Sequence, residues 1–154
     1  RAGLLKKIVG LKYFNVFGPR QDPSSQYAAV IPHFVTRMLR EERPIIFGDG
    51  KQSRDFTFVA NVVEANILAA KALNVSGEVF NIGCGERTTV NDLVSKINEI
   101  LGKDIRPSHS EPRPGDVRHS YADISKARKL LEYHPAVSFD EGLKRVAQFY
   151  KERK

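Results

Sequence analysis

Two short stretches of the sequence each place arginine beside aspartate in a turn that contains glycine. Residues 48–56 read GDGKQSRDF and residues 113–120 read RPGDVRHS. A planar guanidinium donates parallel hydrogen bonds to phosphate oxygens, and a carboxylate accepts from the hydroxyls of a ribose or another sugar. The two stretches predict a pocket for a nucleoside diphosphate that carries a sugar. Two ordinary surface turns with local ion pairs are the alternative, because exposed Arg–Asp pairs are common and weak.

The strands and helices that position these two stretches can be predicted from alternating sequence patterns. A run of aliphatic and aromatic residues predicts a strand at 8–14, and the polar loop after it begins with Asn15. Because α/β folds bind ligands at the carboxyl ends of strands, Asn15 either bonds a ligand or forms an Asx turn. Phe47 ends another strand, where a core position is favoured over packing on a flat base. Further strands are expected at 43–47, 54–59, 78–83 and 105–108, and helices at 27–40, 62–73, 91–101, from Asp123 or Ser125 to Leu131, and from Ser138 onward.

Local signals predict where several helices begin and end. Asn61 is expected to cap the helix at 62–73, whose apolar residues lie on nearly all sides and so predict a well-buried helix. Thr89 followed by Asp92 has the spacing of a capping box for the next helix, and Gly102 is expected to end that helix.

The composition bounds the kind of protein. The 154 residues, 41% hydrophobic and 28% charged, are enough for a single domain, residues 1–154, with its own core. The net charge is +7, but Lys and Arg are scattered rather than interleaved with aromatics, so no nucleic-acid partner is expected. No apolar run reaches membrane-spanning length, so no membrane partner is expected. Cys84 is the one cysteine, which fits a cytoplasmic location.

A complete set of catalytic groups cannot be assembled from the sequence. It contains no Cys/His metal spacing, no serine nucleophile elbow and no glycine-rich dinucleotide fingerprint after a strand. No catalytic residue and no metal ligand is therefore named. A strand so close to Arg1, which is not methionine, also suggests part of a longer protein. The sequence thus predicts a specificity domain whose chemistry comes from elsewhere.

Four motifs in register carry a family likeness. The segments LKYFNVFGPRQDP, YAAVIP, GDGKQSRDFTFV and RPGDVRHSYADISKA together resemble the C-terminal half of nucleotide-sugar epimerases and dehydratases of the extended short-chain dehydrogenase/reductase family, with UDP-hexose 4-epimerases closest. The resemblance implies an α/β fold, the C-terminal substrate-binding part of a Rossmann-type enzyme, with one or more strands that belong to the missing parallel sheet. The family's NAD fingerprint and catalytic Tyr-x-x-x-Lys pair are expected before Arg1, in an N-terminal NAD-binding domain, so this chain alone is expected to be inactive.

The resemblance assigns binding residues by motif position. Tyr13 and Phe14 resemble the pair beside the nicotinamide of NAD, the implied cofactor, and beside the glycosyl group. Contacts with the UDP-sugar are implied at ten further positions. They are Asn15 on the diphosphate or sugar, Ala28, Ala29 and Val30 along the glycosyl and uridine portions, Ile46 and Phe47 at the uracil, Arg54 and Arg113 on the diphosphate, Asp116 on the ribose, and Ser120 at the sugar.

Ser120 bears on which sugar fits. A bulky residue at the position it resembles closes the pocket over the sugar's 2-substituent, whereas serine leaves volume and a hydroxyl for an acetamido group. The resemblance therefore implies a 4-epimerase, a homodimer like many family members, that accepts UDP-GlcNAc and UDP-GalNAc besides UDP-glucose and UDP-galactose. Within the family, the alternatives are a dTDP-glucose 4,6-dehydratase and a UDP-glucuronate decarboxylase or epimerase. A non-catalytic nucleotide-sugar-binding module is the alternative of another class.

Overall fold

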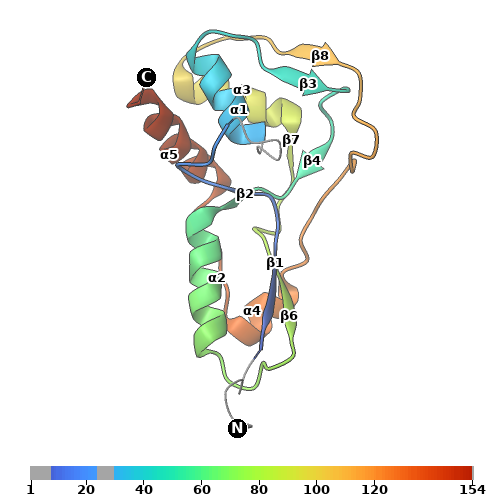
Figure 1. The fold of residues 1–154 in the computed structure, drawn as a ribbon, viewed down its shortest axis with the longest axis vertical. Helices are drawn as coiled ribbons and strands as arrows, with labels where there is room; N and C mark the ends of the chain where they lie inside the picture. Colours follow the sequence, from blue (N-terminus) through green and yellow to red (C-terminus); the bar gives the residue numbers. More distant parts are fainter. Residues whose placement is uncertain (1–7, 24–29, 154) are drawn as a thin grey trace.

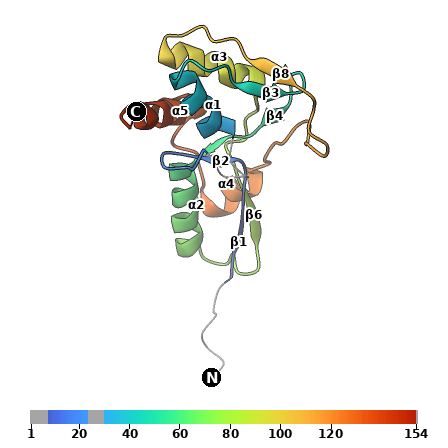
Figure 2. The same cartoon turned by 45° about the horizontal axis from the view of Figure 1, so that its top comes forward.

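The computed structural model describes residues 8–23 and 30–153. Its elements, in chain order, are β1 (Gly10–Tyr13), β2 (Val16–Phe17), α1 (Val30–Leu39), β3 (Ile45–Phe47), β4 (Ser53–Arg54), β5 (Thr57–Phe58), α2 (Val59–Lys71), β6 (Val79–Ile82), β7 (Thr88–Thr89), α3 (Val90–Leu101), β8 (Ser108–Ser110), α4 (Ser125–Leu131) and α5 (Phe139–Lys151). They form two lobes (Figure 1). The lower lobe holds β1, β6, α2 and α4, and the upper lobe holds α1, α3, α5, β3 and β8. The turned view of Figure 2 keeps the same division, with β2 where the lobes meet.

The centre of the lower lobe is the parallel strand pair β1 and β6. Gly10 lies opposite Val79, and Tyr13 lies opposite Ile82. Parallel strands need a long crossover, and here the chain passes through the upper lobe and returns along α2 before it enters β6. The pairs β2–β5 and β3–β8 are also parallel. These parallel pairs, with the helices beside them, confirm the predicted α/β class.

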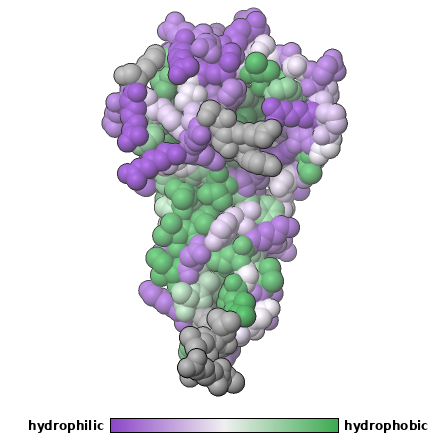
Figure 3. Space-filling view, viewed as in Figure 1, coloured by the Kyte–Doolittle hydropathy of each residue, from purple (hydrophilic) through white to green (hydrophobic). Residues whose placement is uncertain are grey.

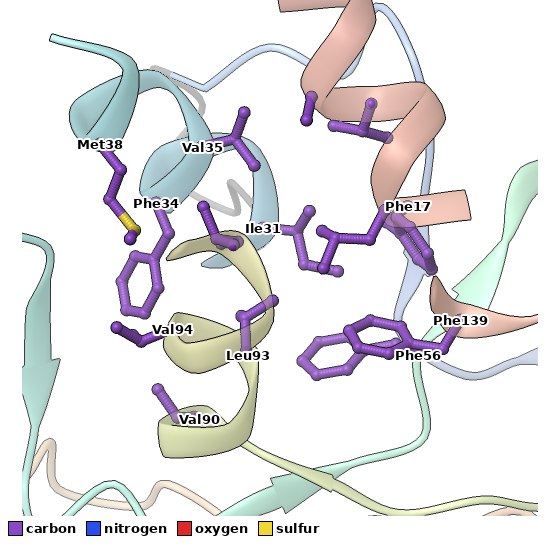
Figure 4. Close-up of a cluster of buried hydrophobic side chains, with 14 of the residues drawn as sticks. Phe17, Ile31, Phe34, Val35, Met38, Phe56, Val90, Leu93, Val94 and Phe139 are labelled. Atoms are coloured by element: carbon purple, nitrogen blue, oxygen red, sulfur yellow. The ribbon is translucent and has the colours of Figure 1, made fainter. Parts of the chain in front are cut away.

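The upper lobe has its own hydrophobic core, in which α1, α3 and α5 pack together (Figure 4). The rings of Phe56 and Phe139 are stacked with centroids 5.4 Å apart, and Phe17 meets Phe139 edge to face at 5.7 Å. Gly142 of α5 lies so close to Phe58 that a Cβ would come within 2.7 Å of the ring. Through Phe56 and Phe58, this core anchors β5 and the segment before it against the helices.

Local signals placed three helix termini correctly. The Thr89 side chain accepts from the backbone N–H of Asp92, and the Asp92 carboxylate accepts from Thr89 in return, which confirms the capping box of α3. Gly102 follows α3 with a φ of 64°, in the left-handed region that glycine adopts without strain. Ser138 caps α5 by accepting from the N–H of Glu141 at 3.2 Å.

The predicted strand at 54–59 was wrong in its extent. Two dipeptide strands replace it, because the chain leaves its partner β7 after Arg54 and joins β2 at Thr57. Between them Asp55 turns inward, where its carboxylate accepts from the backbone N–H groups of Cys84 and Gly85. Val59, predicted as the end of the strand, is the first residue of α2. The predicted strand at 105–108 lies later in the chain, as β8 at Ser108–Ser110.

The predicted role of Asn61 as a helix cap was also wrong. α2 begins two residues earlier, and its N-cap, Phe58, makes no side-chain cap bond. Asn61 is 1% exposed and bonds the segment before α5: its Oδ1 accepts from the N–H groups of Ala136 and Val137, each at 3.0 Å, and its Nδ2 donates to the Val137 carbonyl. A buried amide takes the partners that tertiary packing offers, so its place in the sequence did not indicate them.

α2 is less buried than its composition predicted. Val59, Val63 and Ile67 follow one another at four-residue intervals and are 38%, 54% and 41% exposed. Figure 3 shows apolar residues gathered on the lower lobe, on the side where α2 and β1 lie. None of the helices within 8–23 and 30–153 combines the length and apolar character that a membrane crossing needs.

Candidate functional site

The two arginine-bearing stretches lie side by side, although about sixty residues separate them. The N–H of Ser53 donates to the Arg118 carbonyl at 2.9 Å, and the N–H of Ser120 donates to the Ser53 carbonyl at 3.0 Å. A parallel bridge joins Ser53 to His119. β4 therefore holds the second stretch in an extended conformation, and side chains from both stretches meet at its surface.

Arg54 and Asp116 form an ion pair across this junction. A second guanidinium nitrogen of Arg54 donates to the Ser53 carbonyl at 2.8 Å. The Arg54 side chain is 16% exposed and the Asp116 side chain 39% exposed, so the pair is partly screened by water. The guanidinium is thus fixed at the wall of the site, and both residues that the resemblance assigned to diphosphate and ribose lie in contact with each other.

Asp49 and Arg118 form a second pair, which sequence reasoning did not assign to the site. The guanidinium of Arg118 donates to both carboxylate oxygens of Asp49, at 2.9 and 2.7 Å. These bonds, together with the N–H of Lys51, lower the pKa of the Asp49 carboxyl from 3.8 to about 2. The sequence does show two arginines beside the Pro-Gly turn, which indicates that this turn carries an ion pair. Which arginine contacts which aspartate depends on the fold.

The larger of the two cavities that these stretches line lies over this junction. It has a volume of about 550 Å³, within the range of small-molecule sites. Four of the residues predicted for the site line it: Phe14, Arg54, Asp116 and Ser120. It is completed by five residues that sequence reasoning did not assign, Lys12, Gly115, Val117, His119 and Tyr121.

A smaller cavity of about 260 Å³ adjoins it and shares Asp116 with it. Phe47 and Arg113, both predicted for the site, line this cavity, and the Arg113 guanidinium lies 3.9 Å from the centre of the Phe47 ring. The core position favoured for Phe47 belongs instead to its neighbour Ile46, which is 1% exposed. Asp49, Gln52 and Arg118 also line the smaller cavity, so its polar wall comes from both stretches.

Several predicted site residues line neither cavity. Tyr13 is 46% exposed on β1, and its hydroxyl donates to Asn66 of α2 at 3.1 Å. Asn15 has a φ of 30°, and its carbonyl accepts from the N–H of Thr57. Val30 begins α1 and packs against the upper core, and the side chain of Ile46 is buried in that core, so any contact of Ile46 with a base would come from its backbone. Ala28 and Ala29 lie outside the described residues.

Asp55, beside Arg54 in the sequence, does not face the site. Its side chain is wholly buried, and its carboxylate accepts from three backbone N–H groups, those of Cys84, Gly85 and Ala122, at 2.8, 2.9 and 3.2 Å. The carboxylate therefore ties β6 and the segment after Ser120 to the β4–β5 connection. Sequence reasoning missed this role because the three N–H groups lie 29 or more residues away.

Among residues 8–23 and 30–153, the remaining titratable groups do not assemble a reactive centre. Burial raises the pKa of the Cys84 thiol to about 11 and raises the pKa of Tyr133 as well. The spacing Tyr-x-x-x-Lys does occur once, at Tyr150 and Lys154, but the Tyr150 hydroxyl donates to the Gln21 carbonyl at the end of α5 and lines neither cavity. Within the described part of the chain, no cluster of His, Cys, Asp and Glu has the arrangement of a metal site.

A family model and several solved structures are similar to this chain. The family model of the NAD dependent epimerase/dehydratase family matches residues 5–83. The UDP-glucose 4-epimerase of Thermotoga maritima, solved with UDP-glucose, is 46% identical with a TM-score of 0.89 over 94% of this chain and 46% of its own. The UDP-N-acetylglucosamine 4-epimerase of Methanobrevibacter ruminantium, solved with UDP-N-acetylmuramic acid, is 42% identical with a TM-score of 0.89 over 95% and 46%.

A third solved relative contains the cofactor. The UDP-glucuronic acid 4-epimerase of Bacillus cereus, in complex with UDP-glucuronic acid and NAD, is 36% identical with a TM-score of 0.86 over 94% of this chain and 45% of its own. The chain spans less than half the length of the first curated relatives that it matches. NAD is the cofactor of the NAD dependent epimerase/dehydratase family, and this chain belongs to that family.

Proposed function

We propose that residues 1–154 are the UDP-sugar-binding domain of an NAD-dependent 4-epimerase of UDP-hexoses and UDP-N-acetylhexosamines. The observation that carries this proposal is the pair of adjoining cavities that share Asp116. A nucleoside diphosphate sugar has two unlike ends joined through a ribose and two phosphates. Two connected cavities with a carboxylate at their junction match that shape.

Each part of the ligand has residues of suitable chemistry in this arrangement. The smaller cavity offers the Phe47 ring and the Arg113 guanidinium to the uracil and the adjoining phosphate. Asp116 accepts from the ribose hydroxyls, and Arg54 donates to the diphosphate. The larger cavity then holds the sugar beside Phe14 and Ser120.

The residues present also fit the implied cofactor. Phe14 lines the larger cavity, and Tyr13, at the end of parallel strand β1, is exposed with its hydroxyl held by Asn66. This aromatic rim can pack against a flat nicotinamide. NAD, when bound, takes a hydride from the sugar's C4 and returns it to the opposite face. The role of this chain is to bind the nucleotide and orient the sugar, and the catalytic residues belong to the rest of the complete polypeptide.

Ser120 supports the acceptance of acetamido sugars. It lines the larger cavity, its backbone is fixed by the bond to Ser53, and a serine takes up little of the space there. In the proposed function, UDP-GlcNAc and UDP-GalNAc are therefore interconverted alongside UDP-glucose and UDP-galactose.

The test is product analysis with the complete polypeptide that contains these residues. Incubation with NAD and each UDP-sugar should give the 4-epimer, with unchanged mass, from both the acetylated and the non-acetylated pair. Loss of carbon dioxide from UDP-glucuronate, or loss of water from dTDP-glucose, would instead establish a decarboxylase or a dehydratase. Binding without turnover by the complete polypeptide would establish a non-catalytic nucleotide-sugar-binding module.

Three further points remain predictions of the same proposal. Residues 1–154 alone should bind the nucleotide sugar without epimerising it. The complete enzyme should sediment as a homodimer, as is common among nucleotide-sugar epimerases. Its cytoplasmic location, inferred from the single cysteine, can be checked by cell fractionation.

A further inference from the structure

His119 is a cavity-lining residue that the proposed function has not yet used. It lies next to Ser120, its backbone is bridged to Ser53 of β4, and its exposed side chain lines the larger cavity together with Arg54. A neutral imidazole has one nitrogen that donates and one that accepts, so the proton's position decides which ligand atoms it can bind.

The buried hydroxyl of Ser53 determines where that proton lies. Ser53 is 3% exposed, and its Oγ lies 2.8 Å from Nδ1 of His119. Among the described residues, this ring nitrogen is the one partner of the Ser53 hydroxyl. A buried hydroxyl hydrogen without an acceptor is costly, so this contact favours the Ser53 hydroxyl as the donor and Nδ1 as the acceptor. The neutral ring then carries its proton on Nε2.

Nε2 is the ring nitrogen left for a ligand. Within the described part of the chain, no protein group forms a hydrogen bond with it. His119 and Arg54 both line the larger cavity, so the imidazole and the guanidinium can reach the same ligand. The Nε2–H of His119 and the guanidinium of Arg54 are then hydrogen-bond donors only. They suit phosphate oxygens, which only accept, better than a sugar hydroxyl, which also has a proton to donate.

We propose that the Nε2–H of His119 donates a hydrogen bond to an oxygen of the nucleotide's diphosphate, beside Arg54, with Ser53 as the positioning residue. This inference rests on the proposed function and adds a ligand-binding residue to it. It requires that the ring keep one tautomer in the free protein, with Nδ1 unprotonated.

The experiment measures binding of UDP, UDP-GlcNAc and uridine to the complete polypeptide by isothermal titration calorimetry. His119→Phe keeps the ring volume and removes the donor, so UDP and UDP-GlcNAc should bind about 10- to 100-fold more weakly, with uridine unchanged. His119→Gln supplies an amide N–H of similar reach and should recover part of that loss. Thermal unfolding of each variant shows whether the fold is intact; if His119→Phe unfolds, His119→Gln and His119→Ala decide.

Nitrogen NMR of the His119 ring provides a separate readout of the positioning role. At neutral pH, Nε2 should carry the proton, and Ser53→Ala should remove this preference and weaken UDP binding less than His119→Phe does. A protonated Nδ1 in the wild-type protein would overturn the orientation by Ser53.

The outcomes separate this inference from the function on which it rests. A wild-type polypeptide that binds neither UDP nor UDP-GlcNAc would overturn the proposed function, and this inference with it. Wild-type binding that His119→Phe leaves unchanged would overturn only the role of His119. A loss confined to UDP-GlcNAc would put the donor on the sugar and overturn the assignment to the diphosphate.

Discussion

The Arg54 guanidinium holds the Asp116 carboxylate across 62 positions of sequence. Its other described contact is with the Ser53 carbonyl at 2.8 Å, which leaves donors of its five N–H groups for a ligand in the larger cavity. Asp116 borders both cavities. One ion pair thus connects the proposed diphosphate contact with the proposed ribose contact. A substitution of either residue should therefore weaken the binding of both parts of the nucleotide.

Arg54→Ala should raise the KM of the complete polypeptide for UDP-sugars about 10- to 100-fold, because a charge-assisted bond to phosphate is lost. Arg54→Lys should recover only part of the loss, since an ammonium cannot reproduce the guanidinium fork. Steady-state kinetics measures both. Arg40→Ala, at an exposed arginine beyond the end of α1, is the matched control and should leave KM unchanged. A wild-type KM in Arg54→Ala would remove Arg54 from the site.

Ser120→Tyr should restrict the sugars that are accepted. A tyrosine at this position would fill part of the larger cavity, so turnover of UDP-GlcNAc should fall at least about tenfold while that of UDP-glucose changes little. The ratio of kcat/KM for the two substrates measures this effect. Ser120→Ala, which keeps the space and removes only the hydroxyl, serves as the comparison. Equal losses for both sugars would show that Ser120 does not discriminate between them.

Asp55→Asn should destabilise the fold. Three backbone N–H groups donate to the carboxylate, and the NH2 of an asparagine amide cannot accept from them. At least one buried donor then loses its acceptor, so the free energy of unfolding should fall by about 2 to 4 kcal/mol. Urea unfolding of this chain measures it. Asp140→Asn, at an exposed ion pair with Lys96, should change the same quantity by less than about 0.5 kcal/mol. Equal effects of the two changes would contradict the anchoring role of Asp55.

The Asp49–Arg118 pair should be visible in an acid titration. The pKa of Asp49 is about 2 in the folded chain and 3.8 in the absence of its partners. Because the folded value is the lower one, the pair's contribution to stability is present above about pH 4 and is lost as pH falls toward 2. NMR titration of the carboxyl should show this midpoint, and Arg118→Gln should raise it. The pKa of Asp123, lowered by bonds from Ser125 instead, should not move.

The apolar stripe of α2 should cause residues 1–154 alone to self-associate. Val63 is 54% exposed, between the exposed neighbours Val59 and Ile67. Val63→Asp should therefore lower the average mass in sedimentation velocity experiments. Leu130→Asp, on an exposed leucine of α4, is the control and should have a smaller effect. If both variants sediment like the wild-type chain, the stripe is not the contact surface.

Strand pairing explains where sequence reasoning about the elements succeeded and failed. The patterns found the long helices, because apolar periodicity over many residues reports a buried face. The strand predicted at 8–14 contains β1. The stretch 54–59 alternates like one strand, yet β4 and β5 pair with different partners. The alternation did not show which strand lies beside each half. It also did not show which residues are buried, because Asp55 and Thr57 alternate with Phe56 and yet are fully buried.

The sequence by itself determined the ends of α3 and the types of residue available to a nucleotide sugar. Thr89 and Asp92 are three residues apart, so a few backbone angles settle their contact. Only the tertiary structure decided that Arg54 faces the cavity while Asp55 is buried, that Asn61 bonds residues 75 or more positions away, and that Ser53 meets His119. Contacts between distant residues depend on how the two lobes pack, because a short stretch of sequence is compatible with many local conformations.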